Sequence, residues 1–215
     1  MPYNIRAERL AYWYFRLNGF LTIENFILHD EARQQQRTEI DLVAFRFPHR
    51  REALCRYDDG EEWMEDSPSF AEKVTPFGAF VEVTVGRCKI NGPWTDQGKG
   101  NLPRALRAFG VVPECQIRTI ADKLYKNGRF CSNIIELALV SLGSEINPDL
   151  KLKMGGVLQI RWQEVKDFIF KRFAQYERIK REHPQWDADG HLLWASFEHS
   201  NRDMRAFGDS LAFVA

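Results

Sequence analysis

The chain has 215 residues, of which 44% are hydrophobic and 13% aromatic. That length suits one α/β domain, and the composition supplies a core and excludes an intrinsically disordered chain. The 30 basic and 30 acidic side chains give a formal net charge of zero. The chain therefore lacks the basic excess of a generic nucleic-acid coat protein, and any contact with nucleic acid must come from a local patch.

Hydrophobic periodicity, capping residues and turn residues predict eight elements. The first helix is expected to begin at the N-cap Asn4 and to end before Gly19. The most valine-rich strand ends at Gly86, and its apolar character indicates a central place in a sheet. In chain order the elements are a helix over Asn4–Asn18, strands over Phe20–Leu28, Thr38–Phe47 and Ala79–Val85, a short helix from Asn101 to Gly110, strands over Ile134–Leu142 and Val157–Arg161, and a long helix over Gln163–His183.

No repeat or low-complexity segment divides the chain, so we expect a single α/β domain over residues 1–215. The polar stretch 29–37 is expected to be a loop or hairpin tip. Residues 49–78 carry an acidic cluster without a clean period and predict an insertion with at most a short helix. Residues 184–215 are expected to form a tail that packs on the core.

The cysteines and the N-terminal segment indicate a cellular compartment. Cys55, Cys88, Cys115 and Cys131 are scattered and form no CxxC pair, which favours reduced thiols over a disulfide framework or a zinc site. The polar N-terminal segment lacks the apolar core of a signal peptide, and no apolar run approaches the ~20 residues of a membrane span. The sequence therefore predicts a cytoplasmic protein without a membrane segment.

Acidic side chains interrupt two of the predicted strands. Side chains alternate along a strand, so Glu39 and Asp41 are expected on one face, and Ile40 and Leu42 on the other. Glu82 stands in the middle of the most apolar strand. Burying an unpaired carboxylate is costly, so two such strands side by side predict a bound cation. Mg²⁺ suits one or two carboxylates together with water.

Two arrangements without a metal stay open. A carboxylate on an edge strand is usually solvated and needs no partner. In the other arrangement, Glu82 pairs with an arginine such as Arg6 or Arg9, and the chain serves as a structural partner.

Three segments together resemble the core of the PD-(D/E)xK nucleases. They are the first helix with Glu8, the strand TEIDLVA with Asp41, and the strand FVEVT with Glu82. The resemblance covers about residues 4–145. It implies a restriction-endonuclease-like core, with a central mixed β-sheet flanked by helices and followed by a long C-terminal helix. It also implies that Asp41 and Glu82 ligate Mg²⁺ (or Mn²⁺), that the Val83 carbonyl adds a ligand, and that Glu8 assists.

One position departs from the family pattern: Thr84 stands where the family has a lysine two residues after the glutamate. That lysine orients or deprotonates the attacking water and stabilises the developing phosphate charge. Lys89 is the closest replacement along the chain, with Lys99 and Lys153 as further candidates, and Gln97 could orient the water instead. Loss of catalysis is the remaining outcome.

The resemblance implies a Mg²⁺-dependent nuclease that hydrolyses phosphodiester bonds in DNA. The alternative is a catalytically inactive nuclease-fold protein that binds protein or nucleic acid. Basic residues gather between Lys151 and Arg181, so the long helix is expected either to contact the DNA backbone or to present an ordinary solvated face. Nuclease domains of this size in the family are often dimeric, so a homodimer is an expected assembly.

Overall fold

A mixed six-stranded sheet forms the centre of the computed structural model, which describes residues 2–30, 35–55, 61–71, 73–177 and 186–214. The strand order is β2-β3-β6-β8-β7, and β9 also pairs with β8. The pairs β6–β8 and β8–β9 are parallel, and the other pairs are antiparallel. The strands are β2 (Leu21–Asp30), β3 (Gln35–Arg46), β6 (Phe77–Val83), β7 (Arg129–Cys131), β8 (Glu136–Gly143) and β9 (Leu158–Arg161).

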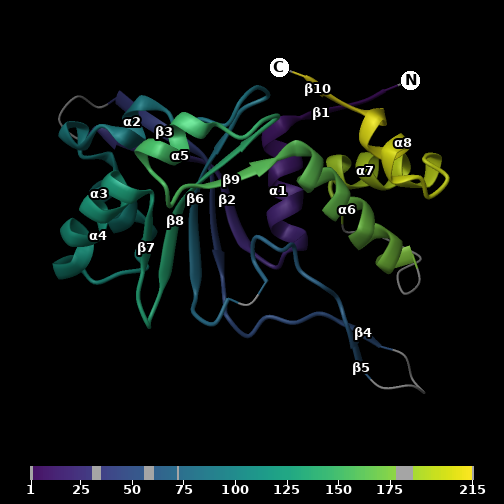
Figure 1. The fold of residues 1–215 in the computed structure, drawn as a ribbon, viewed down its shortest axis with the longest axis horizontal. Coiled ribbons are helices and arrows are strands. Elements are labelled where there is room, and N and C mark those ends of the chain that lie inside the picture. Colours follow the sequence, from purple (N-terminus) through teal and green to yellow (C-terminus); the bar gives the residue numbers. More distant parts are fainter. Residues whose placement is uncertain (1, 31–34, 56–60, 72, 178–185, 215) are drawn as a thin grey trace.

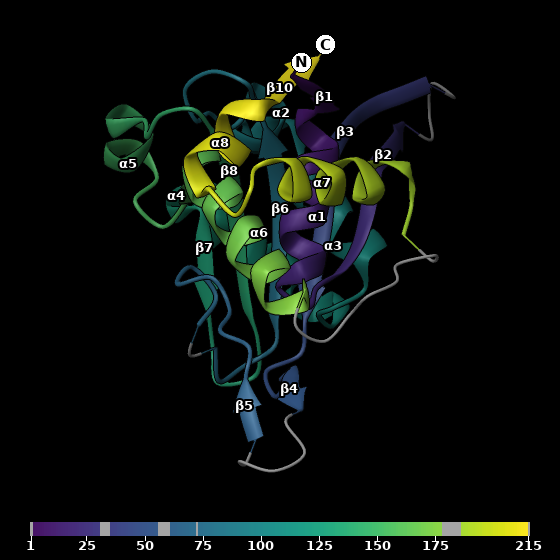
Figure 2. The same ribbon diagram turned by 90° about the vertical axis from the view of Figure 1, so that its right-hand side faces the viewer.

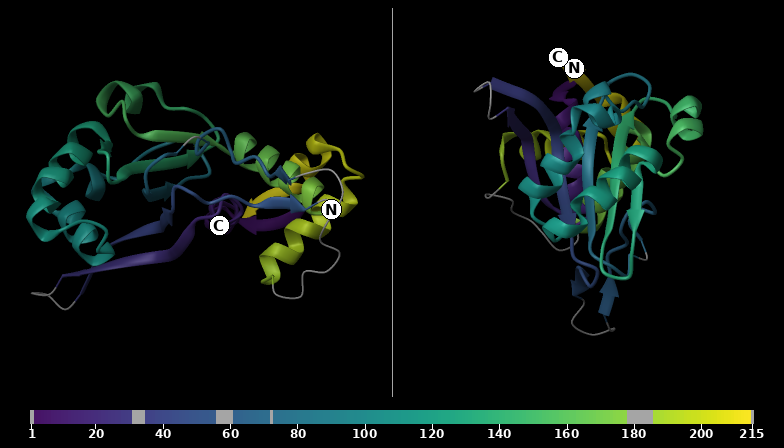
Figure 3. Two further views of the ribbon diagram at one scale, coloured as in Figure 1. Left: turned by 90° about the horizontal axis from the view of Figure 1, so that it is seen from below. Right: turned by 90° about the vertical axis from the view of Figure 1, so that its left-hand side faces the viewer.

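Helices cover both faces of this sheet (Figures 1 and 3). One face carries α1 (Ala7–Leu17) and α6 (Trp162–Glu177), and beyond them lie α7 (Ala188–His199) and α8 (Met204–Ser210). The remaining helices are α2 (Gly92–Thr95), the short 3₁₀ helix η1 (Gln97–Lys99), α3 (Asn101–Phe109), α4 (Glu114–Asn127) and α5 (Pro148–Lys153). Of these, α3 and α4 cover the opposite face.

Alternating side chains of the central strands supply a separate core to each face. Val81 and Val140 point into the core under α1 and α6. Phe80 and Leu139 point into the core under α3 and α4. The α/β class and the mixed sheet between helices agree with the sequence prediction, since strands buried on both faces read as continuous apolar runs.

Two small strand pairs lie outside the central sheet. β1 (Tyr3–Arg6) pairs in parallel with β10 (Leu211–Val214), which brings the two ends of the described chain together (Figure 1). β4 (Ala53–Cys55) and β5 (Glu61–Trp63) form a hairpin that projects from one end of the molecule (Figure 2). The described part of the segment 49–78 contains no helix, and the hairpin within it was not predicted.

The boundaries of the predicted elements differ most at the N-terminus and in the first hairpin. The first helix begins at Ala7, so the N-cap prediction for Asn4 is wrong, because this residue lies in β1 and pairs with Ala212. The strands β2 and β3 both extend into the stretch 29–37, which was expected to be a loop or hairpin tip and which ends the antiparallel pair β2–β3. The helices α4 and α5 and the strand β7 were not predicted.

The later elements follow the prediction more closely. The helix α3 and the strands β8 and β9 are confirmed to within two residues. The long helix is confirmed as α6, and the predicted residues 178–183 lie outside the described chain. The predicted tail contains α7, α8 and β10, and these elements pack on α6 and on β1.

In the β2–β3 hairpin, the side chains change faces of the sheet at one position, Asn25. Asn25 has a left-handed φ of 50° and lies across from Asp41, between the pairs Glu24–Leu42 and Phe26–Ile40. On either side of this point, Leu42 packs in the core under α1 whereas Ile40 packs in the core under α3 and α4. The prediction that Ile40 and Leu42 share one face is therefore wrong, because the twist at Asn25 exchanges the faces.

Two further sequence predictions concern thiols and membranes. The thiols of Cys88, Cys115 and Cys131 are free, and the side chain of Cys55 lies outside the described set. Within the ranges given above, no helix combines the length and the apolar character that a membrane crossing requires.

Candidate functional site

Asp41 and Glu82 lie where the pairing of β3 with β6 ends. The last register pair at this end joins Leu42 to Val81, so Asp41 and Glu82 are the next residues along the two strands. Beyond this pair, the Val83 N–H donates a hydrogen bond of 2.7 Å to the Asp41 carboxylate. The Asp41 side chain thus takes the place of a strand partner and is fixed at the open edge of β6.

The main chain after Glu82 also faces this edge. The Thr84 N–H donates to the Leu142 carbonyl of β8 at 3.0 Å. Because peptide groups alternate sides along a strand, the Val83 N–H and carbonyl point away from β8 and toward β3. The Val83 carbonyl, which the resemblance names as a metal ligand, therefore lies on the Asp41 side of the strand.

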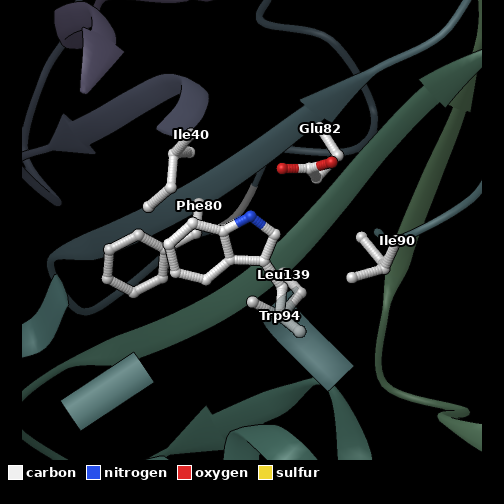
Figure 4. Close-up of a pocket in the computed structure, with 6 residues that line it drawn as sticks. All are labelled: Ile40, Phe80, Glu82, Ile90, Trp94 and Leu139. Carbon is white, nitrogen blue, oxygen red and sulfur yellow. The ribbon is translucent and has the colours of Figure 1, made fainter. Parts of the chain in front are cut away.

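Glu82 is a buried acid, with only 5% of its surface exposed. Ile40, Phe80, Ile90, Trp94 and Leu139 surround it, and the gap that they leave is too narrow for a water molecule (Figure 4). Burial, followed by the negative charge of Asp41, raises the pKa of the Glu82 carboxyl to about 8. Without a cation, Glu82 therefore holds its proton at neutral pH.

Asn91 is the residue that hydrogen-bonds Glu82. The Asn91 side-chain amide donates to the Glu82 carboxylate, and Asn91 thereby opposes the rise in the pKa of this carboxyl. Asn91 precedes α2, where its carbonyl accepts the Trp94 N–H at 3.0 Å. One residue thus orients Glu82 and begins the helix that closes one side of the site.

The two acids border a hollow of 410 Å³ that opens to solvent. Residues from the middle of β3 line it together with Asn91 and the first residues of α2. The lining residues are Thr38, Glu39, Asp41, Glu82, Asn91, Gly92, Pro93 and Trp94. Burial also raises the pKa of Asp41, the Val83 N–H opposes that shift, and the negative charges of Glu8 and Glu39 add to it. The acidic groups of the hollow therefore repel one another, so that each one opposes the ionisation of its neighbours.

The positive charge of Lys89 influences the pKa values of both acids. This charge lowers the pKa of Asp41 and that of Glu82, opposing the upward shifts that burial causes. Lys89 belongs to the loop between β6 and α2 and is exposed. Among the residues that the structure describes, neither Asp41 nor Glu82 forms an ion pair with a lysine or arginine. The charge of Lys89 therefore acts on the two carboxylates without a direct ion pair.

Of the other predicted site residues, Glu8 lies near Asp41, whereas Gln97 and Thr84 form hydrogen bonds to other elements. Glu8, at the start of α1, is near enough for its charge to act on Asp41, and it pairs with Arg6 at 3.6 Å. Gln97 lies in η1 and donates to Asp122 of α4 at 2.8 Å, so its amide is directed at that helix. Thr84 directly follows β6, and its carbonyl accepts the Trp162 indole N–H at 2.8 Å.

Among the described residues, no arginine forms an ion pair with Glu82. Arg9 binds Glu24, Asp187 and Asp189, and Arg6 pairs with Glu8. Both arginines are thus occupied elsewhere.

The donor set at the hollow consists of hard oxygen atoms. Among the described residues, no three His, Cys, Asp or Glu side chains are arranged as a closed metal site. Mg²⁺ needs no such cage, because one or two carboxylates with water and substrate phosphate suffice. Asp41 and Glu82 fit that requirement, with the Val83 carbonyl on the same side.

The basic residues of α6 are largely used inside the protein. Lys166 donates to the carbonyls of Gly208 and Leu211 at 2.7 and 3.1 Å. The side chain of Arg172 has no exposed surface and pairs with Glu52 and Asp66 at 3.3 Å. The predicted cations at positions 178, 180 and 181 lie outside the described residues. The described part of α6 therefore contributes little free positive charge.

Sequence reasoning missed two residues of the site, Asn91 and Ser141. Ser141 lies in β8, fully buried, and its hydroxyl bonds to the Lys89 main chain. A hydroxyl inside the apolar run Leu137–Leu142 was the available signal, because a buried polar group requires a partner. Asn91 stands before Gly92 and Pro93, which marks a helix start.

Comparison with protein-family models, with curated protein sequences and with solved structures finds no match. Function is therefore inferred from the residues of the hollow themselves.

Proposed function

We propose that this protein is a Mg²⁺-dependent (or Mn²⁺-dependent) nuclease of restriction-endonuclease-like fold that hydrolyses phosphodiester bonds in DNA. The supporting observation is the carboxylate pair Asp41 and Glu82 at the end of the β3–β6 ladder, in an open hollow where Lys89 acts on both acids. Buried acids with raised pKa values beside one cation in a cleft are typical of functional sites.

Each residue of the hollow has a proposed role. Asp41 and Glu82 hold the metal ion, the Val83 carbonyl can add an oxygen, and Asn91 keeps Glu82 in orientation. A Mg²⁺ ion held there would lower the pKa of water and would offset the charge of the scissile phosphate. Lys89 supplies the positive charge that Thr84 lacks and orients the attacking water.

Cleavage of a supercoiled plasmid in Mg²⁺ or Mn²⁺ tests the proposal. We expect Asp41→Ala to lower the cleavage rate by about a hundredfold or more, because one of two metal-holding carboxylates is lost. Lys89→Ala should lower the rate as well while leaving Mn²⁺ binding, followed by calorimetry, intact.

The matched control is Glu145→Gln, which removes an acid whose side chain is 68% exposed and pairs only loosely with Arg87 at 3.7 Å. This variant should cleave at the wild-type rate. Equal cleavage by wild type and Asp41→Ala would contradict the proposed site.

The second candidate function is binding without cleavage, which Thr84 favours because the usual lysine is absent. In that case the wild-type protein would bind DNA or a partner protein and leave DNA intact in both metals. Restoring the family pattern with Thr84→Lys should then produce cleavage if the rest of the site is complete.

A further inference from the structure

The loop after β6 is attached to β8 by a buried hydroxyl group. Ser141 is the register partner of Glu82 on the neighbouring parallel strand, so the two side chains lie on the same face of the sheet. The Ser141 hydroxyl accepts a hydrogen bond from the Lys89 N–H at 2.9 Å and donates one to the Lys89 carbonyl at 2.8 Å. Both polar groups of one main-chain residue are thus held by one side chain.

A serine is an unexpected residue at this place in the sheet. Its neighbours on the same face, Leu139 and Phe80, are apolar, and Ser141 itself has no exposed surface. A buried hydroxyl is destabilising unless it finds hydrogen-bond partners. The two bonds to Lys89 satisfy it, so the serine serves the loop rather than the core.

Further contacts hold the residues around Lys89. The Cys88 N–H donates to the Glu145 carbonyl at 2.9 Å, and the Asn147 amide donates to the Cys88 carbonyl at 2.9 Å. On the other side, Asn91 bonds to Glu82. The main chain is therefore fixed on both sides of Lys89, and this path sets the point from which the lysine side chain leaves the loop.

We propose that Ser141 is a positioning residue: by fixing the Lys89 main chain through both of its polar groups, it sets where the Lys89 side chain starts in the loop that leads from Glu82 to Asn91, and so supplies a lysine near the position where the family lysine is replaced by Thr84. The catalytic consequence rests on the proposed function. The restraint on Lys89 does not, so the two parts can be tested separately.

The restraint is tested in the full-length, metal-free protein with Ser141→Ala. The measured quantity is the NMR order parameter of the Lys89 Cε group, with the exposed Lys153 of α5 as internal reference. We expect Lys89 to be more ordered than Lys153 in the wild type and to fall to the Lys153 level in the variant. An unchanged value for Lys89 would overturn the proposal.

Catalysis is tested by moving the lysine. Ser141→Ala should lower kcat by about ten- to a hundredfold with little change in KM, because small displacements of a catalytic group have effects of this size. In the Thr84→Lys/Lys89→Ala background, which returns the lysine to the family position, the same change should alter kcat by less than about threefold. Equal losses in both backgrounds would assign Ser141 a general structural role and overturn its role in catalysis.

Ser196→Ala is the matched control. Ser196 is also buried, lies in α7 and bonds to the Ser210 hydroxyl at 2.6 Å. It should change neither the Lys89 order parameter nor kcat. A wild-type protein that fails to cleave DNA would contradict the proposed function, and the order parameter alone would then decide whether Ser141 holds Lys89.

Discussion

The proton on Glu82 links the chemistry of the hollow to the stability of the fold. A glutamate ordinarily has a pKa near 4.5, whereas burial raises that of Glu82 to about 8. Between these values the folded chain holds a proton that the unfolded chain has released. The free energy of unfolding therefore falls as pH rises through this window and levels off above it.

We accordingly expect Glu82→Gln to stabilise the metal-free protein at pH 9 and to have little effect at pH 4.5. The shift corresponds to an effect on the order of 5 kcal/mol at high pH, since one pKa unit is about 1.4 kcal/mol. Urea unfolding in a chelating buffer across this pH range measures it. Glu145→Gln, at an exposed site, should keep the wild-type pH dependence, and a parallel profile for Glu82→Gln would refute the assignment.

The sequence predicted the two acids of the hollow, but it did not predict the residues that orient them. Asp41 and Glu82 are recognisable because a charged residue within an apolar strand is unusual. The closeness of Lys89 to both depends on the path of a loop, and Ser141 and Asn91 define that path through contacts with residues far along the chain. No local pattern encodes those distances, so Lys89 was one of several lysine candidates.

The helix α7 packs so closely on α1 that an additional side-chain atom would not fit between them. Gly190 lies in the first turn of α7 and faces Trp13 of α1, where an added Cβ would come within 2.1 Å of the indole ring. That ring is fully buried, and its N–H bonds to Asp187 at 3.3 Å, so it cannot move aside easily.

We expect Gly190→Ala to lower the free energy of unfolding by about 1–3 kcal/mol or more, as overpacking does. Urea titration at pH 7 measures the change. Gly86→Ala is the control, because a Cβ there meets nothing within 4 Å. If both variants are equally stable, α7 does not dock on α1 as described.

Elements with long apolar patterns were predictable, and short or overlooked ones were not. α4 carries Ile117, Ile120, Ala121 and Leu124 at helical spacing after Pro113, so its pattern was present in the sequence and missed. β1 has four residues and pairs with a strand some two hundred positions later. Its existence depends on that partner, which local propensity cannot supply.

The tail and the sheet belong to one cooperative unit in the whole molecule. Phe207 of α8 is fully buried, its ring lies 5.7 Å from that of Phe170 in α6, and both belong to the core that also contains Val81 and Val140 of the central strands. The apolar contacts thus continue from the last helix into the central strands.

Phe207→Ala should therefore lower the stability of the entire protein by about 3–5 kcal/mol, the usual effect of removing a buried phenylalanine. Far-UV and near-UV circular dichroism should report a single coincident transition at a lower urea concentration. Two separated transitions would mean that the tail unfolds independently of the sheet.

The parallel pair β1–β10 also determines how the molecule responds to mechanical tension. The two strands run in the same direction, with Tyr3 beside Leu211 and Arg6 beside Val214. Tension applied to the two ends of the chain pulls these strands past each other, so the hydrogen bonds that join them are strained together in shear. The force thus reaches the β1–β10 pair first. Stretching must break all of its hydrogen bonds together before tension reaches the helices behind it.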